Sequence, residues 1–140
     1  VATMLFEKNN LMMQADVAEN IAMPLRIQGK SRARAVQEAL GFLDSVALPR
    51  GIASMTPAML SGGDQQRVAI ARALAADSQI LLAAEPARNL DVENAAGILR
   101  LIDAFAHREG RCAVIATADE TLAAQADARI VIEGGNVREE

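Results

Sequence analysis

Apolar residues recur at helical spacing through the first half of the chain. Those in residues 17–25 share one face of a helix, and Asp16 followed by Glu19 forms a capping box at its start. The same spacing predicts a second helix from Ser31 to Pro49. No strand pattern separates these two helices, so the sequence predicts a helical unit in this region.

The second half of the chain has a different pattern, in which short apolar runs alternate with segments of helical periodicity. The expected strands cover residues 2–6, 79–84, 112–117, 129–133 and 137–139, and the expected helices cover residues 64–76, 92–107 and 121–126. Residues 50–59 read as a loop, and residues 134–136 as a tight turn. Alternation of strand and helix favours an α/β domain with a mostly parallel sheet, in which we expect residues 79–84 to be a buried strand.

The composition of the chain excludes several classes of function. The 140 residues are 51% hydrophobic, enough for one domain with a core, and they carry a net charge of −4 with three aromatic residues. A chain without basic excess or stacking surfaces is not expected to bind nucleic acid. One cysteine and one histidine cannot build a tetrahedral zinc site, and no apolar run is long enough for a membrane span. Any membrane link would therefore run through a partner.

Ser61, Gly62 and Gly63 precede a predicted helix and form a candidate anion site. They bring together a hydroxyl, unhindered backbone N–H groups and the positive end of a helix dipole. Alone, the triplet fits a surface helix with a glycine hinge equally well. The longer string from Leu60 to Leu74, LSGGDQQRVAIARAL, resembles the signature motif and following helix of ATP-binding cassette (ABC) proteins at nearly every position.

The resemblance extends over essentially the whole chain. Residues 79–86 resemble the Walker B strand with its catalytic glutamate, Glu85, and residues 115–119 lie where the family has its switch histidine. The remaining motif residues are Asn89, Leu90 and Asp91 for the D-loop, and Phe6, Glu7, Lys8, Asn9, Asn10 and Leu11 for the Q-loop. The family then implies a P-loop NTPase-like (RecA-like) parallel sheet core, represented by its C-terminal half, with an inserted α-helical subdomain.

That resemblance also implies boundaries and a branch. Residues 1–15 correspond to the Q-loop strand and loop, residues 16–58 to the helical subdomain, and residues 59–140 to the signature, Walker B, D-loop and switch region. Residues 19–25 are similar to the branch that serves lipoprotein-releasing, macrolide-efflux and cell-division transporters. Chromosome-maintenance relatives insert long coiled coils before the signature, and no heptads occur here. A transporter ATPase is favoured.

Several positions depart from the family pattern. No G-x-x-x-x-G-K-[ST] phosphate loop occurs in the sequence. The chain begins at Val1 rather than Met, so truncation of a longer protein explains the absent loop as readily as evolutionary loss does. Ala84 stands where the family has its magnesium aspartate, and Ala118 where it has the histidine. Glu7 replaces the Q-loop glutamine and remains a weak metal ligand, although its charge opposes the phosphates.

The pattern of losses suggests two hypotheses, and leaves open whether the chain is an enzyme. The family implies ATP and Mg²⁺ as cofactors, a second cassette in a homo- or heterodimer, and a permease that holds the subunit at the cytoplasmic face of the membrane. In the first hypothesis the chain is impaired in hydrolysis but offers its signature to a partner's ATP. The signature residues are Leu60, Ser61, Gly62, Gly63, Asp64 and Gln65. The alternative is a non-catalytic interaction module or a degenerate relic.

Residues outside the motifs have simpler interpretations. We expect Asp119 to cap a short helix, His107 to supply a favourable charge at a helix C-terminus, and Cys112 to pack in the core. The six methionines all precede residue 60 and suit either core filling or a groove for the permease. Loss of a central strand would expose strand edges and an apolar sheet face.

Overall fold

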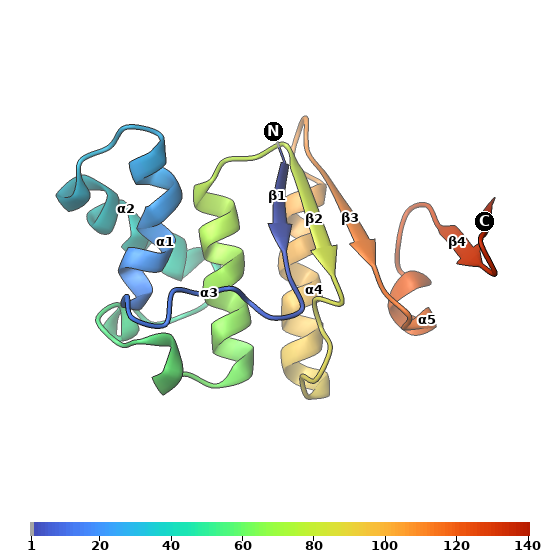
Figure 1. The fold of residues 1–140 in the computed structure, drawn as a ribbon, viewed down its shortest axis with the longest axis horizontal. Coiled ribbons are helices and arrows are strands. Elements are labelled where there is room, and N and C mark those ends of the chain that lie inside the picture. Colours follow the sequence, from blue (N-terminus) through green and yellow to red (C-terminus); the bar gives the residue numbers. More distant parts are fainter. Residues whose placement is uncertain (1) are drawn as a thin grey trace.

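A computed structural model describes residues 2–140, which fold into an α/β unit with a helical layer at one side (Figure 1). The helices are α1 (Val17–Ile27), α2 (Arg32–Ser45), α3 (Gly62–Ala75), α4 (Val92–Ala106) and α5 (Glu120–Ala123), and the strands are β1 (Ala2–Leu5), β2 (Ile80–Ala84), β3 (Cys112–Ala116), β4 (Ile130–Glu133) and β5 (Asn136–Glu139). The predicted α/β class and helical unit are confirmed. Residues 50–59, predicted as a loop, contain two short 3₁₀ turns, at Arg50–Ile52 and Pro57–Met59.

Three parallel strands form the sheet, in the order β1-β2-β3. The register pairs Met4 with Leu82, and Leu82 with Val114. The last two strands do not join it, because β4 pairs antiparallel with β5 in a separate hairpin. The expected third alternating strand, residues 129–133, is therefore not part of the parallel sheet among residues 2–140.

The helical unit is held by a core of its own. Helices α1, α2 and α3 pack on one another, and Val17, Ile21 and Leu43 are fully buried among them. Asp16 caps α1 by accepting the N–H of Glu19 at 2.8 Å, and Ser31 caps α2. Both predicted helix starts are confirmed.

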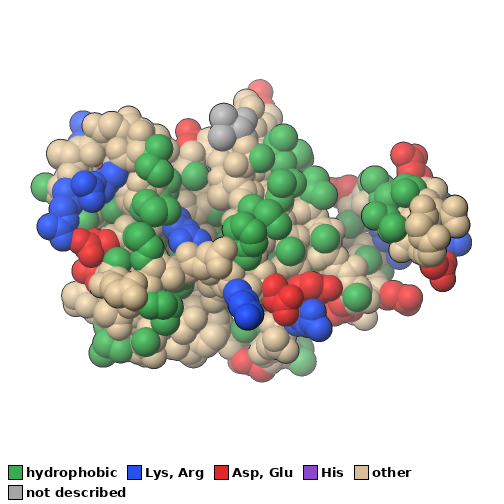
Figure 2. All heavy atoms as spheres, viewed as in Figure 1, with side chains coloured by type: hydrophobic (Ala, Val, Ile, Leu, Met, Phe, Trp, Pro, Cys, Tyr) green, Lys and Arg blue, Asp and Glu red, His purple; other side chains and the backbone are tan. Residues whose placement is uncertain are grey.

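Within the part of the chain that the structure describes, helices cover one face of the sheet. Helices α3 and α4 pack against the face that carries Leu5, Leu81 and Ala83, all buried. On the opposite face the alternate side chains of each strand are exposed, which Figure 2 shows as a patch of hydrophobic side chains over the strands. The expectation of a buried strand at residues 79–84 is therefore wrong for every second residue. Cys112 is exposed on this face for the same reason, rather than packed in the core.

No helix within residues 2–140 combines the length and the apolar composition needed to cross a membrane.

Candidate functional site

The signature segment lies at the exposed start of α3. Ser61 is the N-cap, and its Oγ accepts the N–H of Asp64 at 3.2 Å. Gly62 and Gly63 occupy the first turn, where backbone N–H groups have no intrahelical acceptor. The amide of Gln65 donates to the carbonyls of Pro57 and Leu60, at 2.9 and 3.3 Å, and so fixes the loop that leads into the helix. The result is an anchored helix start with an exposed serine and free donors.

The structure joins this helix start to the D-loop. A Cβ on Gly63 would lie 2.7 Å from the side chain of Asn94 in α4, so any larger residue there would force that side chain to shift. Asn94 in turn donates to Asp91, through its backbone N–H at 2.9 Å and its side-chain amide at 2.7 Å. Gln66, which is buried, donates to the carbonyl of Pro86 at 3.0 Å. Sequence reasoning did not identify Asn94 and Gln66 as site residues, although Asn94 stands three residues after Asp91, the spacing of a helix cap.

Backbone geometry and hydrogen bonds define the D-loop itself. Asn89 adopts a left-handed conformation, with φ of 62°, and Leu90 packs against the core. Asp91 caps α4, and the backbone N–H of Asn94 holds the pKa of its carboxyl below the usual value. Asp91 is thus an exposed, ionised carboxylate in a fixed position.

Glu85 follows β2 and is held by the segment after β3. Its carboxylate accepts the hydroxyl of Thr117 at 3.0 Å and the backbone N–H of Ala118 at 2.8 Å. Its own N–H donates to the carbonyl of Ala116 at 2.9 Å, and its φ is 44°. Ala118 therefore binds Glu85 through the backbone, although it has no imidazole. Thr117 is a second contact that the motif comparison missed, and its only signal is its place next to the switch position.

The residues at the metal position do not fit Mg²⁺. Ala84 ends β2 with a methyl group, which cannot orient metal-bound water. The carboxylate of Glu7 is engaged with Arg88, whose nitrogen lies 3.5 Å from it, in an exposed ion pair. Among residues 2–140 no three His, Cys, Asp or Glu side chains are grouped so that they could hold a metal ion. At the carboxyl ends of β1, β2 and β3, the motif positions offer two carboxylates to a cation, those of Glu7 and Glu85.

The motif segments converge on one end of the molecule. The strands β1, β2 and β3 run toward the same end at which α3 and α4 begin (Figure 1). Glu7, Glu85 and Ala118 follow the three carboxyl ends, and Ser61 and Asp91 precede the two helices. This is the edge of a parallel sheet at which α/β proteins bind ligands.

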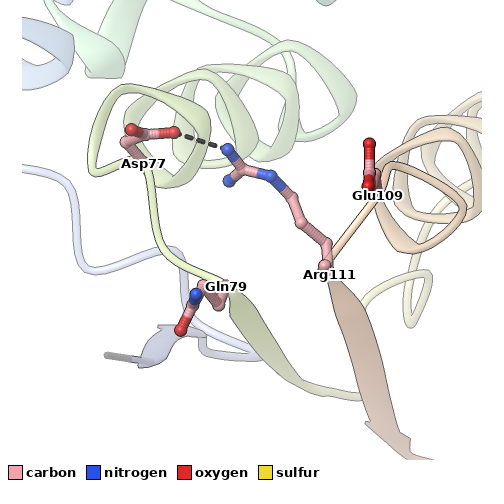
Figure 3. Close-up of a pocket in the computed structure, with 5 residues that line it drawn as sticks. Asp77, Gln79, Glu109 and Arg111 are labelled. Carbon is pink, nitrogen blue, oxygen red and sulfur yellow. Dashed lines mark hydrogen bonds and ion pairs between the residues drawn. The ribbon is translucent and has the colours of Figure 1, made fainter.

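The hollow drawn in Figure 3 lies at the other end of the strands. Its volume is about 350 Å³, and Asp77, Gln79, Glu109 and Arg111 line it with Gly110. Arg111 pairs with Asp77 at 2.5 Å and donates to the carbonyl of Ser78 at 2.6 Å. Of the motif segments, only the Walker B strand reaches this hollow, through its first residue, Gln79. The ion pair joins the connections before β2 and β3, at the end of the strands opposite the candidate site.

A second hollow, of about 660 Å³, lies on the helical unit between the loop before α1, α1 and the start of α2. Met12 and Met23 line it together with Glu19 and Arg32, which form an ion pair at its margin. Two of the six methionines thus line a groove, and its use by a permease stays a prediction.

Comparison with known proteins identifies relatives. The sequence profile of the family described as "ABC transporter" matches residues 2–88. The lipoprotein-releasing system ATP-binding protein LolD of Shewanella sp. (strain MR-4) is 39% identical over 131 residues, which is 94% of this chain and 56% of LolD. The macrolide export ATP-binding/permease protein MacB of Rhodospirillum rubrum is 38% identical over 96% of this chain and 20% of its own.

Solved structures agree with these relatives. A dimeric structure of a post-hydrolysis state of the ATP-binding cassette MJ0796, bound to ADP and Pi, superposes with a TM-score of 0.87 at 34% identity. The match covers 99% of this chain and 62% of that one. The chain spans just over half the length of the LolD relatives it matches.

Proposed function

The chain belongs to the ABC transporter family, and we propose that it is part of a transporter's ATP-binding subunit that completes the ATP site of a partner cassette while being impaired in hydrolysis at its own. The family binds ATP with Mg²⁺, and its fold is the P-loop NTPase fold. The observation that carries the proposal is a contrast within one site. The start of α3 keeps its capping serine, as anion binding there would require. The end of β2 carries the methyl group of Ala84 where the resemblance implies a metal ligand.

The trans role rests on the exposed end of α3. The resemblance implies that two cassettes pair head to tail, with each ATP between the Walker motifs of one and the signature of the other. Ser61 and Gly62 are exposed at the helix start, where an anion gains both hydrogen bonds and the helix dipole. The contact of Gly63 with Asn94 ties this start to Asp91, the D-loop residue implied to serve the partner.

Impairment in cis rests on three positions. Ala84 offers no metal ligand, and the Ala118 side chain cannot donate to a γ-phosphate. Glu7 stands where the resemblance implies a glutamine, and its carboxylate forms an exposed ion pair with Arg88. Glu85 keeps the position of a general base, and Thr117 and Ala118 orient its carboxylate. The carboxylate of Glu85 is thus held by hydrogen bonds, whereas positions 84 and 118 lack the side chains that would bind Mg²⁺ and the γ-phosphate.

The permease contact is proposed on the helical unit. The groove beside α1 is lined by Met12 and Met23, and adaptable methionine surfaces suit a helix from another protein. Relatives with 38–39% identity carry the names of lipoprotein-releasing and macrolide-export systems, which suggests a permease of this branch. Attachment at the cytoplasmic face of the membrane would follow from that contact.

The test measures ATP turnover by a complete partner cassette. The partner is the Shewanella LolD whose own signature serine has been replaced by Arg, so that turnover depends on a signature supplied by this chain. We expect turnover to rise when the chain is added and to return to baseline with Ser61→Arg. Ser31→Arg is the matched control, because Ser31 is also a helix N-cap but lies on α2. The trans role would be refuted if adding the chain left ATP turnover unchanged, or if Ser61→Arg and Ser31→Arg changed turnover equally.

A second candidate is the non-catalytic interaction module, and the uncovered apolar face of the sheet favours it. Such a chain would associate through that face without any role for nucleotide. Equilibrium binding of MgATP to a mixture of the chain and the signature-disabled LolD separates the two candidates. The trans role requires tighter binding when the chain is present, and a non-catalytic module requires no change.

A further inference from the structure

Gly97 lies inside α4, where glycine is an unfavourable residue. It is buried there, and glycine weakens a helix relative to alanine because it loses more backbone freedom on folding. A Cβ at this position would overlap Nη2 of Arg67 in α3 and would lie 3.3 Å from its Cζ. The missing side chain at Gly97 therefore gives the guanidinium group of Arg67 a place against α4.

The same guanidinium group reaches the helical unit. Its Nη1 donates to the carbonyl of Val46 at 3.1 Å, and Val46 is the fully buried C-cap of α2. The last turn of α2 has no basic residue of its own, although a cation is favourable at that end of a helix dipole. Arg67 supplies this cation from α3. One side chain thus joins α2, α3 and α4 in a three-helix junction.

The interface between α3 and α4 contains a second close contact, in which the two helices exchange roles. Gly63 of α3 faces Asn94 of α4, whereas Gly97 of α4 faces Arg67 of α3. Arg67 follows Gly63 by four residues and Gly97 follows Asn94 by three, so the two contacts lie about one helical turn apart. The helices therefore interlock at two successive turns, which fixes how far one can slide along the other.

The interlocked helices begin with the two groups that are proposed to serve a partner's ATP. Ser61 is the N-cap of α3, Asp91 is the N-cap of α4, and both are exposed. A shift of one helix along the other would change the spacing between these two groups. A misplacement of about 1 Å, even by a change far from the reacting atoms, can slow a reaction on the order of a hundredfold.

We propose that Arg67 is a positioning residue for the trans site. It holds Ser61 and Asp91 at one spacing by locking α3 against α4, and it fastens the helical unit to both through Val46. Arg67 acts through the helices rather than on the nucleotide, because its guanidinium group is directed to Val46 and Gly97. This role rests on the trans function proposed above.

Two test variants disturb the junction in different ways. Gly97→Ala keeps the donor but fills its place, and Arg67→Met keeps much of the side-chain volume but removes the donor. The readout is ATP turnover by the signature-disabled LolD with the chain added to saturation. We expect each variant to lower maximal turnover about tenfold and to change half-saturation by ATP less than about twofold, because the resemblance places ATP on the partner's own motifs. Unchanged maximal turnover in both variants would overturn the proposal.

Stability and rescue separate positioning from a merely structural role. Gly97→Ala should leave Tm unchanged or raise it, because alanine is the better helix former and the end of a long side chain can swing aside. Adding Arg67→Lys to Gly97→Ala should restore most of the turnover, since the compact ammonium group needs less room and can still donate to Val46. Loss of turnover that follows a loss of Tm, or no recovery with lysine, would overturn the positioning role.

Gly41→Ala is the matched control. Gly41 also lies inside a helix, α2, but a Cβ there would meet nothing within 4 Å. The control gains the same methyl group and the same helix propensity as Gly97→Ala without reaching Arg67. It should therefore keep wild-type turnover. Equal losses in Gly41→Ala and Gly97→Ala would contradict the role of the junction.

A distance measurement without nucleotide examines the junction by itself. Gln37 and Arg100 are exposed on α2 and α4, so Gln37→Cys and Arg100→Cys in a Cys112→Ser background accept a pair of spin labels. Double electron–electron resonance then gives the distribution of distances between the helical unit and α4. We expect both test variants to widen or shift this distribution and the control variant to leave it unchanged. An unchanged distribution in both test variants would overturn the proposal.

Failure of the proposal and failure of the trans function give different results. If the wild-type chain does not stimulate LolD, the trans function and the positioning role are both refuted, and an altered distance distribution would leave Arg67 as a structural fastening of the helical unit. If the wild-type chain and both test variants stimulate LolD equally, the positioning role alone is refuted and the trans function stands.

Discussion

The helical unit and the sheet use the same kinds of side chain with opposite results. In the helical unit, Val17, Ile21 and Leu43 are fully buried by neighbouring helices of the same chain. In the sheet, Leu82 and Val114 are exposed although they are equally apolar. The difference lies in the number of covering layers. The apolar face of each of these helices packs on another helix, whereas within residues 2–140 no helix covers the second face of the sheet. Hydrophobicity alone therefore does not decide burial here.

The candidate site also has two parts that differ, the helix starts and the carboxyl ends of the strands. Groups on the helix starts, Ser61 and Asp91, have their capping partners and fixed positions. Positions at the carboxyl ends of the sheet strands, Ala84 and Ala118, carry methyl groups where the resemblance implies an aspartate and a histidine. Glu85 is the exception, since its carboxylate is held by two donors. The groups proposed to serve a partner are thus better preserved than those that would serve the chain's own nucleotide.

The largest expected effect on stability comes from truncating a buried side chain in the core of the helical unit. Ile21→Ala should lower the free energy of unfolding by about 2–5 kcal/mol, because it removes buried methyl groups and leaves a cavity. Leu82→Ala, on the bare face, should change it by less than about 1 kcal/mol. Urea unfolding of both variants measures the difference. Equal losses of unfolding free energy would mean that the sheet face is covered in solution, and would contradict the contrast between the helical unit and the sheet.

Asn20 offers a polar test of the same unit. Its side chain is fully buried, accepts the N–H of Met12 at 2.7 Å and donates to the carbonyl of Asp16 at 2.9 Å. Asn20→Ala should cost about 2–3 kcal/mol, because backbone groups of the loop lose their partner. Thermal unfolding monitored by circular dichroism measures the loss. Asn20→Ser, which retains one polar group, should cost less, and the reverse order would contradict this account.

Much of the fold follows from the sequence, and the exceptions have a physical cause. Caps at Asp16, Ser31 and Asp119 are local interactions, so residue type and spacing predict them. The exposure of Cys112 depends on what covers a sheet face, which no local pattern contains. The place of β4 likewise depends on whether a strand lies beside β3.

The site shows the same limit. The motif residues follow from a string of identities, and the structure places them at one end of the sheet. The contacts of Asn94 with Gly63 and of Thr117 with Glu85 join segments about thirty residues apart in the chain. Neither Asn94 nor Thr117 belongs to a residue type or spacing that marks such a contact. Tertiary packing alone brings these pairs together.

The two signature glycines should respond oppositely to one methyl group. Gly63→Ala would place Cβ 2.7 Å from Asn94 and should cost about 1–2 kcal/mol of unfolding free energy. Gly62→Ala meets nothing within 4 Å and should be neutral or stabilising by up to about 1 kcal/mol. Urea unfolding measures both. The double variant Gly63→Ala with Asn94→Ala should recover part of the loss, and an additive result would contradict the proposed contact.

The smallest expected effect is a pH dependence at the far end of α4. His107 is the C-cap, and the backbone carbonyl of Asp103 raises the pKa of its ring, with further help from the charges of Asp103 and Asp127. A raised pKa means that protonated His107 favours the folded chain. Its contribution is therefore complete below the unfolded pKa near 6.5 and is lost as pH rises through the folded pKa. We expect the Tm difference between wild type and His107→Gln to shrink from pH 5.5 to pH 8.5, and added salt to reduce it, because the group is exposed. An NMR titration midpoint for His107 at or below about 6.5 would rule out this cap charge.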